Sequence, residues 1–242
     1  LFSLDKMQGE LSQYSDGVRC HVRVHASLSA IVQILPEDLG AFIRRHGEIK
    51  IDLEEHLSAE VLRAVQEGAA DLGICNAAMA PGAAGAELQT LPYRRDRLVL
   101  IVPRGHALAA RARIAFTETL DFDHVGLHAN SSIYLAMRQA AAREGRSIRL
   151  RIHVTGLDAM CRMIDNGLGI GVMPQRAFEL MHGVGDLESV ALSDSWAERQ
   201  LQLVARDFST LPRTARLLVD HLTAAPAAGG TGPARTRRAI AA

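Results

Sequence analysis

Polar side chains cluster at three points where the sequence predicts that a strand passes into a helix. The three turns are residues 25–29 (HASLS), 127–132 (LHANSS) and 154–156 (VTG). Each offers a hydroxyl group, free backbone N–H groups and the positive end of a helix dipole, which together suit a carboxylate. For any one serine, a helix cap is the commoner role. Two serine clusters at matching places in two halves of the chain make a binding pocket as good an explanation as capping.

No set of residues in the sequence indicates catalysis or metal binding. GxSxG, HExxH, a glycine-rich phosphate loop with lysine, and GxGxxG after a strand are all missing from it. His128 is the histidine that we place in a cleft, although a structural role is the commoner one for a lone histidine. His21, His25 and His153 lie in predicted strands without a partner at metal-ligand spacing. We therefore predict no catalytic residue, no metal site and no cofactor.

The elements that must position these turns alternate between strand and helix, which is typical of an α/β fold. Apolar periodicity predicts strands at 19–25, 49–53, 71–75, 97–102, 124–127, 148–154, 168–172 and 200–204. It predicts helices at 29–45, 59–67, 132–144, 157–165 and 209–222, with another opened by Pro174. Pro36 predicts a kink or a later start in the first helix. The first three strands form a β-α-β-α-β unit, so we expect a largely parallel sheet.

Two such series predict two Rossmann-like lobes that are joined by a hinge and separated by a cleft. Lobe I would comprise residues 16–96 plus 200–224, and lobe II residues 97–199. Residues 1–15 look like the end of a longer helix, residues 80–86 like a flexible loop, and residues 225–242 like a disordered tail. The charged run Arg94-Arg95-Asp96-Arg97 lies near the crossing, and we expect it to be solvated surface.

Composition places the chain among ordinary globular proteins, with 48% hydrophobic and 22% charged residues. Lys plus Arg and Asp plus Glu both number 27, so net charge gives no case for nucleic-acid binding by this chain. Cys20, Cys75 and Cys161 are expected to be buried thiols in a reducing compartment. No apolar run reaches the roughly 20 residues that span a bilayer, and the start lacks a signal-peptide core. A cytoplasmic location without membrane contact is the default expectation.

Four segments carry a resemblance to a known family. They are 22–42 (VRVHASLSAIVQILPEDLGAF), 62–74 (LRAVQEGAADLGI), 98–108 (LVLIVPRGHAL) and 161–174 (CRMIDNGLGIGVMP). Each is weak alone, but their order and spacing resemble the effector-binding (regulatory) domain of a LysR-type transcriptional regulator over residues 1–224. The resemblance implies a type 2 periplasmic-binding-protein fold. It also implies that residues 1–15 end a linker helix, and that promoter DNA is contacted only through an N-terminal domain outside this chain.

The resemblance further implies a small effector, an organic acid, and assembly as a homodimer or tetramer through helices 29–45 and 132–144, although the apolar stripes of these helices could equally face their own sheets. The sequence shows no fixed arginine for the pocket, which favours a monoanion or a neutral polar molecule over a dianion. The family's loop proline is replaced by His46-Gly47-Glu48, which affects a loop rather than the pocket. Carried over by position, the effector would contact ten residues: Ser27, Leu28, Ser29, Asn76, His128, Asn130, Ser131, Ser132, and, along the floor, Val172 and Met173.

Two other functions remain open from the sequence. A solute-binding protein of a transport system has the same fold, but the linker-like start and the odd number of cysteines favour the regulator. An enzyme of this fold, such as a dehydratase, would need an acid and a base facing the cleft. His128 has no Asp or Glu partner in its own segment, so we expect a binding domain rather than an enzyme.

Overall fold

The sheet of the first lobe is built from the β-α-β-α-β unit that the sequence predicts. The computed structural model describes residues 21–76, 88–181 and 183–224. In it, β1 (His21–Ala26) lies between β2 (Lys50–Glu55) and β3 (Leu72–Cys75) and runs parallel to both. Their carboxyl ends therefore lie at one edge of the sheet, where the chain turns into the helices that follow β1 and β2.

The helix predicted over 29–45 is two helices. α2 (Leu28–Gln33) and α3 (Leu35–Arg45) meet at Ile34, whose φ of −137° and ψ of −46° are not helical. Pro36 then stands in the first turn of α3, where a missing N–H costs no intrahelical hydrogen bond. The break that Pro36 predicts is thus confirmed, and it places α2 as a short element directly after the first polar turn.

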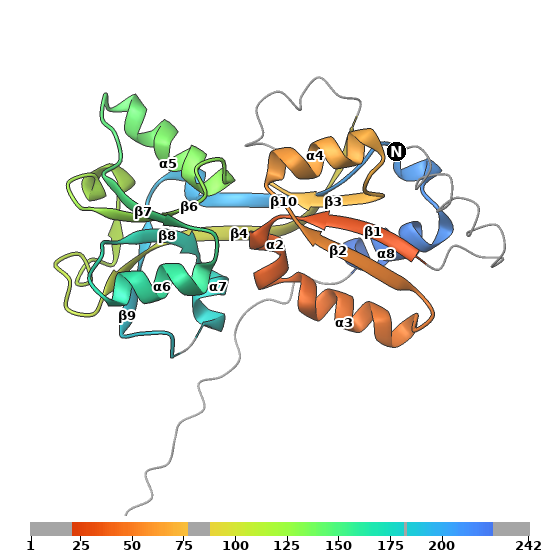
Figure 1. Cartoon of the computed structure of the whole chain (residues 1–242), viewed down its shortest axis with the longest axis horizontal. Coiled ribbons are helices and arrows are strands. Elements are labelled where there is room, and N and C mark those ends of the chain that lie inside the picture. The colour runs from red at the N-terminus through yellow and green to blue at the C-terminus, as the bar shows by residue number, and fades with distance from the viewer. Residues whose placement is uncertain (1–20, 77–87, 182, 225–242) are drawn as a thin grey trace, which may run out of the picture.

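Helices cover both faces of the lobe I sheet. α3 and α8 (Arg213–Ala224) pack on one face, in a hydrophobic cluster with Ile74 and Leu203. α4 (Ser58–Glu67) packs on the other, in a cluster with Cys75 and Val204, the next residues along the same strands. Alternate side chains of a strand point to opposite faces, so both faces of these strands are buried. Figure 1 shows α4 on the opposite side of the sheet from α2 and α3.

Two long strands run between the lobes. β4 (Gln89–Pro103) pairs with β10 (Glu198–Ala205) over residues 89–97. From Leu98 onward it pairs with β8 (Gly171–Pro174) and β9 (Leu187–Leu192) instead. The crossing strand expected at 97–102 is therefore longer than predicted. β10 runs antiparallel to both β3 and β4. The sheet is mixed, and the expectation of a largely parallel sheet is wrong at these crossing strands (Figure 1).

The second lobe repeats the alternation of strand and helix. We call the part around β1, β2 and β3 lobe I, and the part around β6, β7 and β8 lobe II. β6 and β7 pair in parallel, and short β5 pairs with β9, a strand that the sequence analysis did not assign. The elements of lobe II are β5 (Arg113–Ile114), β6 (His124–Leu127), α5 (Ser132–Arg143), β7 (Leu150–Val154), α6 (Leu157–Asp165), β8 (Gly171–Pro174), α7 (Gln175–Leu180) and β9 (Leu187–Leu192). Short 3-10 turns are Phe116–Thr119, Ser195–Ala197 and Phe208–Thr210.

Cys75 and Cys161 are free and buried, as the sequence predicts. Burial raises the pKa of Cys75 to about 12 and that of Cys161 to about 11, so both thiols stay protonated at neutral pH. Cys20, the linker end 1–15, the loop 80–86 and the tail 225–242 lie outside the described residues. The lobe boundaries stay predictions. In the described part of the chain, the helices are all too short or too polar to cross a membrane.

Candidate functional site

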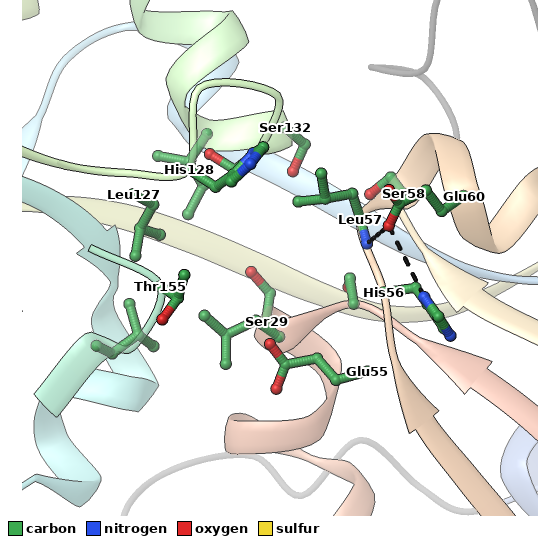
Figure 2. A pocket seen from close by; sticks show the side chains of 15 residues that line it. Ser29, Glu55, His56, Leu57, Ser58, Glu60, Leu127, His128, Ser132 and Thr155 are labelled. Atoms are coloured by element: carbon green, nitrogen blue, oxygen red, sulfur yellow. Dashed lines mark hydrogen bonds and ion pairs between the residues drawn. The ribbon is translucent and has the colours of Figure 1, made fainter. Parts of the chain in front are cut away.

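A pocket of about 300 Å³ lies between the two lobes. Four strand-to-helix turns line it, two from each lobe. Lobe I supplies the turns from β1 to α2 and from β2 to α4, and lobe II those from β6 to α5 and from β7 to α6. Figure 2 shows Leu127, His128 and Thr155 facing Ser29 and Glu55 across the cavity. Since carboxyl ends of parallel strands meet at one edge, the two turns of each lobe are brought together by strand pairing alone.

Six of the predicted residues line this pocket. They are Ser27, Leu28, Ser29, His128, Ser131 and Ser132. Thr155, from the third turn singled out in the sequence, lines it too. The structure thus brings together the two serine clusters from opposite halves of the chain.

Ser27, Ser29, Ser131 and Ser132 form one side of the pocket, which we call the serine wall. Their hydroxyl groups differ in what they bind. Ser131, the N-cap of α5, accepts a hydrogen bond from the backbone N–H of Tyr134 at 3.2 Å. Ser27 holds the N-cap position of α2, but its hydroxyl makes no capping bond and is buried without a partner among the described residues. A buried hydroxyl without a partner costs about 1–3 kcal/mol. Capping therefore accounts for Ser131 and leaves Ser27 unexplained.

A buried arginine stands behind two of the serines. Nη2 of Arg199 donates to Oγ of Ser29 at 3.1 Å, and its Nη1 donates to Oγ of Ser132 at 3.4 Å. Arg199 does not line the pocket itself; its guanidinium is paired with the buried carboxylate of Asp96. An arginine only donates, so each serine oxygen accepts and keeps its own O–H for another partner. Arg199 therefore turns one serine of each lobe into a donor toward the cavity.

The pairing of Asp96 and Arg199 corrects two expectations. The run Arg94–Arg97 is not simply solvated surface, because Asp96 is buried and Arg94 binds Asp38 at 2.8 Å with only 11% of its side chain exposed. The sequence alone also indicates no fixed arginine for the pocket, whereas Arg199 lies directly behind it. Arg199 lies in β10 directly opposite Asp96 in β4, and neighbouring strands do not reveal their register in the sequence.

His128 acts as a hydrogen-bond donor in this arrangement. Its Nδ1 lies 3.1 Å from the backbone nitrogen of Asn130, which can only donate. Nδ1 must accept, so the proton of the neutral ring is on Nε2. An imidazole held in this way offers an N–H to a ligand in the pocket.

The turn from β2 to α4 was missed as part of the site. It contributes Glu55, His56, Leu57, Ser58 and Glu60. Glu60 accepts the backbone N–H of Leu57 at 3.1 Å and so fixes the start of α4. The signal was available, because Ser58 follows a predicted strand as a hydroxyl at a helix start. Two carboxylates make this wall an acceptor surface, opposite in character to the serine wall.

Four predicted residues do not line the pocket. Val172 and Met173 are fully buried in the hydrophobic cluster of lobe II, where β8 pairs with β4, so they form no floor. Asn76 is buried at the end of β3, and Asn130 is exposed beside His128. These four positions were carried over by resemblance; the ends of β3 and β8 do not line the cavity, whereas Asn130 lies in a turn that does line it through His128 and Ser131.

A family model and curated relatives match most of this chain. The family model described as the LysR substrate binding domain matches residues 15–227. A curated relative, the "Probable RuBisCO transcriptional regulator" of Emiliania huxleyi, is 22% identical over 184 residues, which cover 75% of this chain and 58% of the relative. The chain thus spans little more than half the length of that relative.

Solved structures share the fold at low sequence identity. The regulatory domain of CcmR from Synechocystis PCC6803, in complex with 2-PG, matches with a TM-score of 0.75 and 22% identity over 84% of this chain and 96% of that one. The effector binding domain of QuiR, in complex with shikimate, matches with a TM-score of 0.70 and 16% identity over 84% and 94% of the two chains.

Proposed function

The chain belongs to the LysR substrate binding domain family, and from this premise we propose that its inter-lobe pocket binds a small organic acid as an effector. The fold is the type 2 periplasmic-binding-protein-like fold that the sequence predicts. Two of the structures that share it are complexes with small ligands, 2-PG and shikimate. Their ligands support a binding role for this pocket, and its own residues support the chemical class.

The observation that carries the proposal is the set of donors on the serine wall. Ser29, Ser131 and Ser132 already accept hydrogen bonds from N–H groups, so their hydroxyl hydrogens are free for a ligand. Ser27 has no partner among the described residues, and His128 offers Nε2–H. Donors from both lobes on one cavity suit a ligand with acceptor oxygens, and a carboxylate is the simplest of these.

The charges around the pocket favour a monoanion. Asp96 neutralises Arg199, and the opposite wall carries the carboxylates of Glu55 and Glu60. A second negative charge would face these carboxylates and be repelled. Hydroxyl groups on the far end of the effector would instead donate to them. We propose a hydroxylated monocarboxylate whose acid group lies against Ser27, Ser29 and Ser132.

For the whole protein we propose a LysR-type transcriptional regulator located in the cytoplasm. It would act as a homodimer or tetramer and bind promoter DNA through an N-terminal domain outside this chain. Relatives named as transcriptional regulators support this over a transport protein. We propose no enzymatic role, because Nδ1 of His128 is engaged by the backbone and the hydroxyl groups act as donors.

Contacts of two arginines between the lobes would link effector binding to the angle between the lobes. Arg199 contacts Ser29 and Ser132 at the pocket, while Arg176 in α7 donates to the carbonyl of Gln33 in α2 at 2.6 Å. An effector that binds both serines would favour one lobe angle over another, and the ligand shifts the equilibrium by its difference in affinity. The change in angle would then reach the DNA-binding domains through the assembly.

Ser27→Ala is expected to weaken effector binding at least tenfold without destabilising the free domain. Removing an unpartnered hydroxyl leaves no donor unsatisfied, whereas a lost hydrogen bond to a carboxylate costs about 1.5–3 kcal/mol. The measurement is thermal unfolding of the wild type and the variant against a library of small carboxylates. A ligand at 100 times its Kd adds about 2.7 kcal/mol and raises the Tm by a few degrees.

Ser147→Ala is the matched control, because Ser147 is exposed in the segment between α5 and β7. It should respond to the effector as the wild type does. Equal responses of Ser27→Ala and Ser147→Ala to every ligand would place the binding site elsewhere. A wild type that responds only to neutral or cationic compounds would refute the organic-acid class while leaving the pocket itself in place.

A further inference from the structure

A second polar cluster lies at the same edge of the lobe I sheet, beside the pocket. Oε2 of Glu54 is 2.9 Å from Nε2 of His56 and 3.7 Å from Nε2 of His25. The two imidazole rings are stacked, with centroids 4.5 Å apart and an interplanar angle of 23°. His56 also lines the effector pocket, whereas His25 and Glu54 do not. The cluster is therefore a separate arrangement that shares one residue with the pocket.

Strand pairing explains why these three side chains meet. His25 in β1 is the register partner of Glu54 in β2. His56 directly follows β2, and its backbone N–H still bonds the carbonyl of Ala26 at 3.0 Å, so its side chain lies on the same side as that of Glu54, two residues earlier. The sequence alone shows no ligand partner for His25, because that partner lies on the neighbouring strand and not at a short spacing along the chain.

His25 is the residue whose state is otherwise unexplained. Only 11% of its side chain is exposed, and Nδ1 is buried without a hydrogen-bond partner among the described residues. Its Nε2 lies 3.7 Å from the nearest carboxylate oxygen that we find, which is too far for a hydrogen bond. Buried polar groups in native proteins are nearly always satisfied. A metal ion bound at Nε2 would give that nitrogen a partner, whereas Nδ1 would stay buried without one.

We propose that His25, Glu54 and His56 bind a first-row divalent transition-metal ion of the Zn²⁺ class. One ligand atom from each residue lies within 4.8 Å of the other two. Zn²⁺ holds nitrogen and oxygen ligands at about 2.0–2.2 Å, so two tetrahedral ligand atoms are roughly 3.3 Å apart. The distances of 2.9 and 3.7 Å lie on either side of this value. Two imidazoles and one carboxylate suit Zn²⁺ far better than Mg²⁺ or Ca²⁺, which prefer oxygen ligands.

Glu60 supports the same arrangement from outside it. Its Oε2 lies 3.8 Å from Nδ1 of His56, too far for a hydrogen bond but facing the ring nitrogen opposite the one near Glu54. Histidines that bind a metal through one nitrogen commonly offer the other N–H to a carboxylate, which orients the ring. Glu60 also holds the backbone N–H of Leu57. A metal ion at this site would therefore fix the turn from β2 to α4, which forms one wall of the effector pocket.

The test is calorimetric titration of the domain, freed of any polyhistidine tag, with ZnCl₂ alone. We expect one saturable Zn²⁺ site per chain. Glu54→Gln and His56→Asn should each weaken binding at least tenfold, as loss of one of three ligands requires. Both side chains are partly or largely exposed, so the variants should fold, and circular dichroism checks that they do. His153→Asn, an exposed histidine of β7, is the matched control and should bind as the wild type.

Co²⁺ provides a second readout, because its visible absorption reports nitrogen and oxygen coordination directly. The band should appear with the wild type and His153→Asn and be lost in Glu54→Gln. The proposal is overturned if the wild type shows no saturable Zn²⁺ binding. It is also overturned if Glu54→Gln and His56→Asn bind Zn²⁺ as tightly as the wild type, which would place the ion elsewhere.

Discussion

Asp96→Ala is expected to lower the free energy of unfolding by about 3–5 kcal/mol, the usual cost of leaving one buried charge unpaired. Asp96 and Arg199 are register partners on the crossing strands, and their side chains are 1% and 3% exposed. The substitution would leave the guanidinium of Arg199 buried without a counter-charge and almost without access to water. Urea unfolding of the domain, followed by circular dichroism, measures the loss.

The control for this prediction is a pair of the same chemistry at the surface. Arg104 and Asp186 are 2.9 Å apart, but about two thirds of each side chain is exposed. Exposed pairs contribute about 0–1 kcal/mol, so Asp186→Ala should change stability little. Replacing both buried partners, with Asp96→Leu and Arg199→Met together, should restore much of the loss. A single Asp96→Ala variant as stable as Asp186→Ala would show that water reaches Arg199.

The same ion pair links stability to the candidate site. Arg199 is held by Asp96 and in turn holds the hydroxyls of Ser29 and Ser132, one from each lobe. A buried charge pair contributes little net stability compared with apolar residues of similar size. Its role here is to orient two serine donors at the point where the lobes meet. The stability cost of Asp96→Ala and the geometry of the serine wall therefore have one physical origin.

Local features of the sequence predicted most of the elements and part of the site. Apolar periodicity located α4, α6 and β3 to within a residue. Turn chemistry at the strand ends singled out the serine clusters and Thr155, and all of these turns line the pocket. Such features succeed because helix starts, proline breaks and strand alternation depend on neighbouring residues alone.

Features set by strand pairing could not be predicted in this way. Asp96 and Arg199 are 103 residues apart, and their contact depends on the register of β4 and β10. His25 meets Glu54 for the same reason. Met173 shows the converse, because a position at the end of a strand looks accessible in sequence, yet β8 is buried on both faces. A strand end becomes part of a site only if no other element covers it.

The second large expected effect is a loss of stability of the folded domain in acid. Lowering the pH from about 6.5 to 4 should remove about 3 kcal/mol of stability through His124 alone. This histidine of β6 is fully buried; its Nδ1 lies 3.0 Å from the carbonyl of Phe122 and its Nε2 lies 3.2 Å from Oγ1 of Thr119. Burial lowers its pKa to about 4. In the unfolded chain this histidine has an ordinary pKa near 6.5. Between pH 6.5 and 4 the unfolded chain therefore binds a proton at His124 that the folded chain does not bind.

The sign of the effect follows from this difference. Above pH 6.5 neither state protonates His124, and its contribution to stability is fully present. Between pH 6.5 and 4 the unfolded state binds one more proton, so each unit by which the pH falls lowers the free energy of unfolding by about 1.4 kcal/mol. Burial also lowers the pKa of His25 and His106, which act in the same direction. Only a comparison of variants can therefore assign the slope to His124.

His124→Asn isolates the contribution, because its amide can still donate to the carbonyl of Phe122 and does not titrate. Urea unfolding between pH 7 and 4.5 should give a flatter dependence of stability on pH than the wild type, even if the variant is less stable at pH 7. His153→Asn removes an exposed histidine from the neighbouring strand and should keep the slope of the wild type. Equal slopes for His124→Asn and the wild type would mean that His124 is protonated in the folded lobe, with water or a carboxylate reaching it.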